Sequence, residues 1–124
     1  MNNQLIKTET WSQWITLSVL AILIAIPVTI FGVQIVQTSD PYVKNVLSLT
    51  GNPVQGKAIF QTNCAGCHGW EAHGLVGPSL QAVSKRKSQY GLIHQVISGE
   101  TPPMPKFQPS AQEMADLLSY LEGL

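Results

Sequence analysis

The longest uninterrupted apolar stretch of the chain lies in its first third. Residues 15–36 carry no charged side chain over 22 positions. As an α-helix this stretch would be about 33 Å long, at about 1.5 Å per residue, and the hydrocarbon core of a bilayer is about 30 Å thick. Trp11 and Trp14 precede it, where indole rings favour the lipid headgroups. The pattern predicts an N-terminal segment 1–36 that ends in a transmembrane helix over 15–36.

A cleavable secretory signal peptide is the alternative interpretation of this segment. The apolar region of such a peptide has about 7 to 15 residues and ends in a small-x-small cleavage site. The run here is longer, and residues 36–41 contain no good site of that kind, so an uncleaved signal anchor fits better. Lys7, partly offset by Glu9, gives a weak positive-inside signal. We therefore expect the N-terminus in the cytoplasm and the C-terminal part on the opposite side.

Beyond the anchor, the pattern predicts a short tether followed by a helical domain. Residues 37–50 contain Pro41 and mostly polar or short apolar stretches, which is typical of a connecting segment. From residue 51 onward no alternating apolar and polar run is long enough to predict a strand. The expected fold class is therefore all-α, with the domain over residues 51–124.

Three helices of this domain are marked by N-caps or by apolar positions at helical spacing. The first begins at Asn52 and Pro53. The second carries the apolar residues Leu92, Ile93, Val96 and Ile97 and ends before Gly99. The third begins with a capping box of Ser110 and Glu113 and carries the apolar residues Met114, Leu117, Leu118 and Leu121. Gly56 within the first helix would cost up to about 1 kcal/mol relative to alanine. We therefore expect another helix, the last one, to approach closely at Gly56. A short helical turn is also expected at residues 79–83.

The charge balance excludes some classes of partner. Seven Lys and Arg residues balance seven Asp and Glu residues, and charged residues make up 11% of the chain. A nucleic-acid-binding protein needs an excess of basic side chains for phosphate contacts, so no nucleic-acid partner is expected. The densest cluster, Lys-Arg-Lys at residues 85–87, is typical of a solvated turn, although docking of an acidic partner stays open.

Candidate chemistry is concentrated at residues 64–68, Cys-Ala-Gly-Cys-His. This is the Cys-x-x-Cys-His pattern that attaches a c-type haem. The two thiols add to the haem vinyl groups as thioethers, and the adjacent histidine reaches one axial face of the iron. The pattern predicts one covalent haem c, bound through Cys64 and Cys67, with His68 as an axial iron ligand. For the Lys-Arg-Lys cluster at residues 85–87, neutralisation of a haem propionate then stays open beside the docking of an acidic partner.

Three other uses of a Cys-x-x-Cys pair fit less well. A thioredoxin-like redox pair is expected in a βαβ context, and no such alternation surrounds residues 55–75. A structural zinc site needs four ligands, but the chain has no further cysteine, and His73 and His94 lack the spacing of a ligand pair. A disulfide between residues three apart closes too small a loop to stabilise the fold much.

The second axial ligand is expected from residues 102–105, Pro-Pro-Met-Pro. The prolines restrict the backbone around Met104, and a thioether is a known axial ligand of cytochrome haem. Met114 is an alternative, but it falls on the apolar stripe of the last predicted helix and fits a core position. His73 is a further alternative, although it lies only five residues from His68 and would have to reach the opposite haem face.

These motifs together resemble the class I cytochrome c family over about the last 74 residues. The matching stretches are Gly56 and Phe60 before the cysteine motif, Gly77-Pro78-Ser79-Leu80 after it, Met104-Pro105-Lys106-Phe107, and Leu118-Ser119-Tyr120-Leu121. The resemblance implies a small helical domain around the haem, with the first helix packed on the last near Tyr120. It also implies that the Pro78 carbonyl accepts a hydrogen bond from Nδ1 of His68 and so orients that ligand.

The anchor and short tether are similar to the membrane-anchored mono-haem forms of this family in cyanobacteria. The resemblance implies an electron-transfer protein, not an enzyme, that passes single electrons between membrane redox complexes or carriers by Fe(II)/Fe(III) cycling. Its partners would be the membrane and redox proteins such as a terminal oxidase, a photosystem or a small soluble electron carrier, with no small-molecule substrate. The haem domain would lie on the lumenal or periplasmic side of a thylakoid or plasma membrane.

Two other functions stay open at this point. In a haem enzyme or gas sensor, Met104 would not bind and the sixth coordination site would be open to a small ligand. The sequence offers no obvious distal acid or base beyond His73. In a structural subunit of an oxidase or photosynthetic assembly, the anchor would matter most and the haem would be one relay among several.

Overall fold

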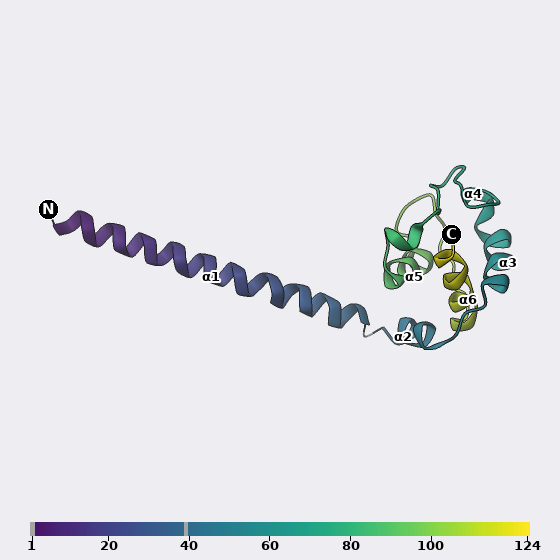
Figure 1. The fold of residues 1–124 in the computed structure, drawn as a ribbon, viewed down its shortest axis with the longest axis horizontal. Coiled ribbons are helices and arrows are strands. Elements are labelled where there is room, and N and C mark those ends of the chain that lie inside the picture. Colours follow the sequence, from purple (N-terminus) through teal and green to yellow (C-terminus); the bar gives the residue numbers. More distant parts are fainter. Residues whose placement is uncertain (1, 39) are drawn as a thin grey trace. The chain divides into compact units, whose positions relative to one another are not determined.

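The chain forms two compact units, Met1–Gln37 and Thr38–Leu124 (Figure 1). The structure is a computed structural model that describes the backbone of residues 2–38 and 40–124, and the side chains of residues 11–36 and 40–124. Within these residues every regular element is a helix. The predicted all-α fold class is confirmed.

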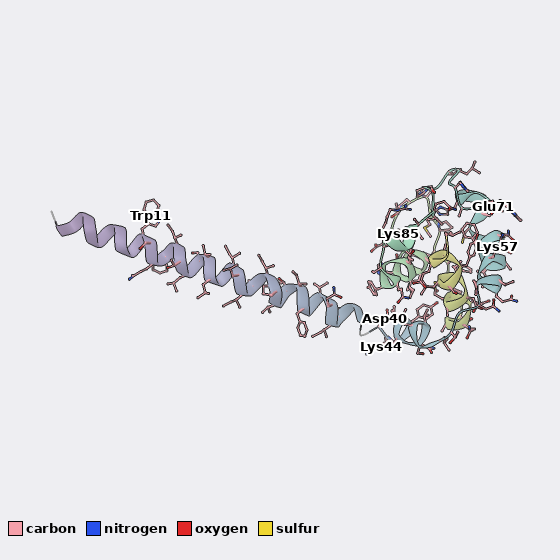
Figure 2. The ribbon with its side chains drawn as sticks, viewed as in Figure 1. Trp11, Asp40, Lys44, Lys57, Glu71 and Lys85 are labelled. Carbon is pink, nitrogen blue, oxygen red and sulfur yellow. The ribbon has the colours of Figure 1, made fainter. Side chains whose placement is uncertain are left out.

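The first unit contains helix α1, Asn2–Thr38, with Pro27 inside it. Its stretch Trp11–Val36 is 26 residues long, and it is apolar enough to cross a membrane by length and composition. All side chains of this stretch are exposed, and Trp11 projects outward from the helix (Figure 2). A helix that is apolar on all sides is typical of a segment surrounded by lipid. The finding is compatible with the predicted single membrane span.

The second unit begins with helix α2, Pro41–Ser48, in a segment where the sequence pattern predicts a tether over 37–50. Asp40 is the N-cap of this helix. Its carboxylate accepts hydrogen bonds from the backbone N–H groups of Tyr42 and Val43, at 2.8 and 3.4 Å. Proline at the first helical position is favourable because the N–H that it lacks would have no partner within the helix. Local chemistry therefore starts a helix directly after residue 40.

Helix α2 packs against helix α6, Ala111–Glu122. Val43 and Val46, three residues apart on one helix face, are only 2% and 1% exposed. The Tyr42 hydroxyl donates a hydrogen bond to the Pro109 carbonyl, at 3.0 Å. A single helical turn thus supplies two buried side chains and a polar contact. The segment therefore contains a helix that packs on α6. Its apolar pattern is too short for this helix to be recognised without α6.

The other helical elements of the second unit are α3 (Pro53–Asn63), α4 (Ala65–His68), the 3-10 helix η1 (Val83–Lys85) and α5 (Gln89–Ser98). The predicted N-cap at Asn52 and the capping box of Ser110 and Glu113 are confirmed. The predicted end before Gly99 is confirmed as well, with that glycine in the left-handed region. The helical turn expected at residues 79–83 lies further along the chain, at η1. Ala82, the residue directly before η1, has a φ of 51° and changes the direction of the backbone there.

Helices α3 and α6 pack side by side in the second unit (Figure 1). A Cβ on Gly56 would lie 2.8 Å from the Cβ of Tyr120 and closer still to the Asp116 carbonyl. The Phe60 side chain is fully buried, and its ring centroid lies 5.4 Å from that of Tyr120. The buried Asp116 carboxylate accepts a hydrogen bond from the backbone N–H of Asn52, at 2.8 Å. The close approach predicted at Gly56 is confirmed.

The docking of α2 can be tested by truncating one of its buried valines. Val43→Ala should lower the free energy of unfolding by about 2 kcal/mol, because it removes two buried methyl groups and leaves a cavity. Chemical denaturation of the haem-loaded protein in detergent, followed through the haem absorbance, measures the change. Val54→Ala is the matched control, because Val54 is 74% exposed and should change the value by less than about 0.5 kcal/mol. If the two substitutions changed the free energy of unfolding equally, α2 would not pack against α6.

Candidate functional site

The cysteine motif forms one short helical turn directly after α3. Cys64 caps the end of α3 and the start of α4. Its carbonyl accepts hydrogen bonds from the backbone N–H groups of Cys67 and His68, at 3.1 and 3.0 Å. The turn brings both thiols and the imidazole into a span of five residues. Cys64 is half-buried, Cys67 is exposed, and His68 is buried.

The two cysteines form no disulfide bond with each other. Burial, and secondarily the neighbouring Cys67, raise the pKa of the Cys64 thiol to about 11. The reactive cysteine of a thioredoxin-like pair has a lowered pKa and is a thiolate near neutral pH. The environment of Cys64 instead raises the pKa of its thiol. The surroundings of Cys64 therefore do not favour the thiolate that such a pair uses.

The His68 side chain has a defined orientation. Its Nδ1 lies 2.8 Å from the Pro78 carbonyl oxygen. Because a carbonyl oxygen only accepts, Nδ1 carries the proton in the neutral ring, and Nε2 keeps a free lone pair. On the side of Gly77 the ring has almost no spare room, since a Cβ there would lie 2.8 Å from Cε1 and 2.9 Å from Nδ1. The ring is therefore oriented by one hydrogen bond and confined by one glycine, with the nitrogen that binds metals left free.

The loop between His68 and Pro78 is tied back onto the α4 turn. The backbone N–H of Gly74 donates to the carbonyl of His68, and that of Gly77 donates to the carbonyl of Cys67, both at 2.8 Å. Gly74 has a φ of +94°, a conformation that L side chains rarely adopt. These bonds return the chain to the motif, so that the Pro78 carbonyl lies beside the imidazole.

Met104 lies in the irregular segment that follows α5. The residue is half-buried and packs against the hydrophobic core. The side-chain amide of Gln95 on α5 donates a hydrogen bond to the Met104 sulfur, with Nε2 3.8 Å from Sδ. The same amide nitrogen lies 3.3 Å from Oγ1 of Thr101, whose carbonyl accepts from the Met104 N–H at 3.0 Å. Gln95 and Thr101 therefore orient the thioether, and neither residue carries a sequence signal for this role.

The two alternative axial ligands have other environments. Met114 is 1% exposed and belongs to the core of the second unit on α6, as its position on the apolar stripe predicts. His73 is exposed, and its Nδ1 lies 3.0 Å from the Glu71 carbonyl oxygen. Of the three candidates, Met104 is the one on an irregular segment that is neither fully buried nor fully exposed.

The donors of this site fit a covalently bound haem. A Cys-x-x-Cys-His turn offers two thiols for thioether bonds and an oriented Nε2 lone pair for iron, and Met104 offers a sulfur. A structural zinc ion would instead need four ligands. Among residues 11–36 and 40–124, no group of three or more His, Cys, Asp or Glu side chains is placed to hold a metal ion.

Comparisons with known proteins agree with this donor set. A family model described as cytochrome c oxidase, cbb3-type, subunit III matches residues 51–121. The chain is 62% identical over 85 residues to a protein named cytochrome c-553-like from Synechocystis sp., which covers 68% of this chain and 81% of that protein. It is 31% identical over 67 residues to cytochrome c-551 of Bacillus subtilis, and this match covers 54% of this chain and 59% of that protein. The resemblance to the cytochrome c family and to a cyanobacterial form of it, cytochrome cM, is confirmed.

The confinement of the His68 ring by Gly77 can be tested with an added methyl group. Gly77→Ala should displace the imidazole, because its Cβ would lie 2.8 Å from Cε1. We expect a loss of low-spin haem absorption and a decrease of about 1 to 3 kcal/mol in the free energy of unfolding. Gly66→Ala is the matched control within the same motif, because a Cβ at Gly66 meets nothing within 4 Å. Indistinguishable spectra and stabilities of the two variants would contradict the role of Gly77.

Proposed function

Because this chain belongs to the cytochrome c family, we propose that it is a membrane-anchored mono-haem cytochrome that passes single electrons between redox partners at a cyanobacterial membrane. Members of the family carry covalent haem c and are electron carriers, not enzymes. The observation that supports the site assignment best is the Nδ1 hydrogen bond of His68 to the Pro78 carbonyl, at 2.8 Å. It leaves Nε2 of the motif histidine ready for an axial bond.

Each proposed site residue has one role. Cys64 and Cys67 would hold the haem covalently, and His68 and Met104 would bind its iron. When bound, the haem supplies a one-electron couple between Fe(II) and Fe(III). With His68 and Met104 both bound, the iron would have no open site for a substrate, and little rearrangement would accompany electron transfer. This distinguishes the proposal from a haem enzyme or a gas sensor, which needs an open sixth site.

The surrounding residues set the properties of the two ligands. The Pro78 carbonyl orients the His68 ring and increases the donor strength of Nε2, because a hydrogen bond from the other ring nitrogen makes the imidazole more basic. On the other ligand, the Gln95 amide and Thr101 restrict where the Met104 sulfur can point. Ligand type and these hydrogen bonds are among the factors by which a protein adjusts a haem potential.

The proposed location rests on α1 and on the cyanobacterial relative. The stretch Trp11–Val36 has the length and composition of a single membrane span, and Trp11 and Trp14 lie at its N-terminal end, where interfacial tryptophans are favoured. We propose an anchor over 1–36 with a cytoplasmic N-terminus, a connection over 37–50 and a haem domain over 51–124 on the lumenal or periplasmic side. The thylakoid and the plasma membrane are the candidate membranes.

The membrane anchor also limits which redox proteins can be partners of this chain. A protein held in a membrane meets other components of that membrane more readily than distant soluble proteins, so we propose a terminal oxidase or a photosystem as the first class of partner. A small soluble carrier that comes to the membrane is the second class. The matched family name mentions an oxidase subunit, and this supports oxidases as partners to be tested first.

The axial role of Met104 can be tested by absorption spectroscopy. The wild-type ferric protein should show a sulfur-to-iron band, and the ferrous protein should bind carbon monoxide slowly. Met104→Ala should abolish the band and accelerate carbon monoxide binding at least about tenfold, because the sixth site opens.

Met114→Ala is the matched control for this substitution, since Met114 is buried in α6. It should lower the free energy of unfolding by about 2 to 5 kcal/mol and leave the band in place. Rapid carbon monoxide binding by the wild-type protein without that band would reject Met104 ligation and favour the enzyme or sensor function.

The anchor can be tested by carbonate extraction of membranes that contain the full chain. The wild-type protein should stay in the membrane pellet. Replacing both Ile24 and Ile26 with arginine should release most of it, because each charge near the middle of the span costs about 2.5 to 3.5 kcal/mol. The control replaces the same residues with leucine and should remain in the pellet. Release of the wild-type protein by carbonate would contradict the anchor.

A further inference from the structure

Arg86 lies in the basic cluster Lys85–Lys87, but its side chain is bound to the backbone of a nearby segment. Nη1 donates to the Gln81 carbonyl at 2.8 Å, and Nη2 donates to the Ser79 carbonyl at 3.0 Å. Within residues 11–36 and 40–124, no carboxylate forms an ion pair with the guanidinium. The group is therefore used to hold two carbonyl oxygens that lie two residues apart in sequence.

These two carbonyls belong to the segment that directly follows Pro78. A second set of hydrogen bonds ties the segment to the loop before it, since the Gln81 side-chain amide donates to the Glu71 carbonyl at 2.8 Å. The backbone N–H of Leu80 donates to the Ala72 carbonyl at 2.9 Å. Residues 79–81 are thus held both by the loop and by Arg86. The carbonyl that accepts from His68 belongs to Pro78, the residue directly before this segment.

We propose that Arg86 is a positioning residue for the axial histidine. By holding the carbonyls of residues 79 and 81, it fixes the chain direction at Pro78 and so maintains the hydrogen bond to Nδ1 of His68. The proposal rests on the proposed role of His68 as an iron ligand. Arg86 itself is not placed against the imidazole, and its effect passes through the backbone of residues 78–81.

The chemistry of arginine suits this task better than that of lysine. The planar guanidinium presents several N–H donors in a fixed fork, so two of its nitrogens can serve two acceptors at once. Lys85 and Lys87 have the same charge but, among the described residues, no side-chain hydrogen bond. Among these three basic residues of the described part of the chain, the middle one makes side-chain hydrogen bonds and its two neighbours make none.

The effect on the haem potential has a definite sign. A strong Nδ1 hydrogen bond makes the imidazole a better donor, which stabilises ferric iron and lowers the reduction potential. Weakening the support from Arg86 should weaken this bond and raise the potential. Loss of a positive charge by itself would lower the reduction potential, because it stabilises ferric iron. The charge effect and the geometric effect therefore have opposite signs. A substitution that retains the charge therefore isolates the geometric effect.

The experiment compares Arg86→Lys with Lys87→Arg in the full-length haem-loaded protein. Both variants keep the net charge, and both exchange the same two residue types. Arg86→Lys should raise the midpoint potential, measured by spectroelectrochemical titration. It should also accelerate exchange of the His68 Nδ1 proton, measured by NMR of the ferrous protein, at least about threefold. Lys87→Arg should leave both quantities at their wild-type values. Unchanged potential and exchange in Arg86→Lys, or equal changes in the two variants, would overturn the proposal.

Two further measurements keep the result interpretable. If Arg86→Lys does not fold, Gln81→Ala is measured in its place, since it removes the tie of the same segment to Glu71; it should also raise the potential, and no shift would overturn the proposal. The ring protons of His68 in the ferrous wild-type protein should show the strong ring-current shift of an axial ligand. Its absence would reject the proposed function itself, independently of any effect of Arg86.

Discussion

The hydrogen bond between Nδ1 of His68 and the Pro78 carbonyl is the interaction on which the site depends. A neutral imidazole has one N–H and one lone pair, so a partner that only accepts decides which nitrogen remains free. The α4 turn delivers the ring, the loop of residues 69–77 returns the chain to it, and Gly77 leaves room for it. Together these features present Nε2 on a histidine that directly follows the second cysteine of the motif.

The packing behind this bond is built on the contact between α3 and α6. Gly56 lets the two backbones approach, Phe60 fills the contact with Tyr120, and Asp116 ties the start of α3 to α6. A unit of this size is close to the limit at which side chains alone can stabilise a fold. A covalently attached haem adds apolar surface and links the motif turn to the rest of the unit. We therefore expect cofactor binding and folding to be coupled in this chain.

Local signals predicted much of the fold. The caps at Asn52 and Ser110 and the end of α5 at Gly99 follow from side chains and backbone preferences within a few residues, and the structure agrees with them. Helix α2 was not predicted, because its two buried valines gain their stability from α6, which lies more than sixty residues later in the chain. The displaced turn at η1 has a similar cause, since Ala82 donates its N–H to the carbonyl of Leu124 at the C-terminus.

The sequence by itself determined the chemistry of this protein. The Cys-x-x-Cys-His motif, the methionine among prolines and the long apolar run are contiguous patterns, and each has its meaning through local spacing. Tertiary structure decided how that chemistry is supported. The contact of Gln95 with the Met104 sulfur and that of Arg86 with the backbone after Pro78 join residues whose spacing has no recognisable pattern. Such contacts depend on where loops return in space, and this is set by the packing of the whole unit.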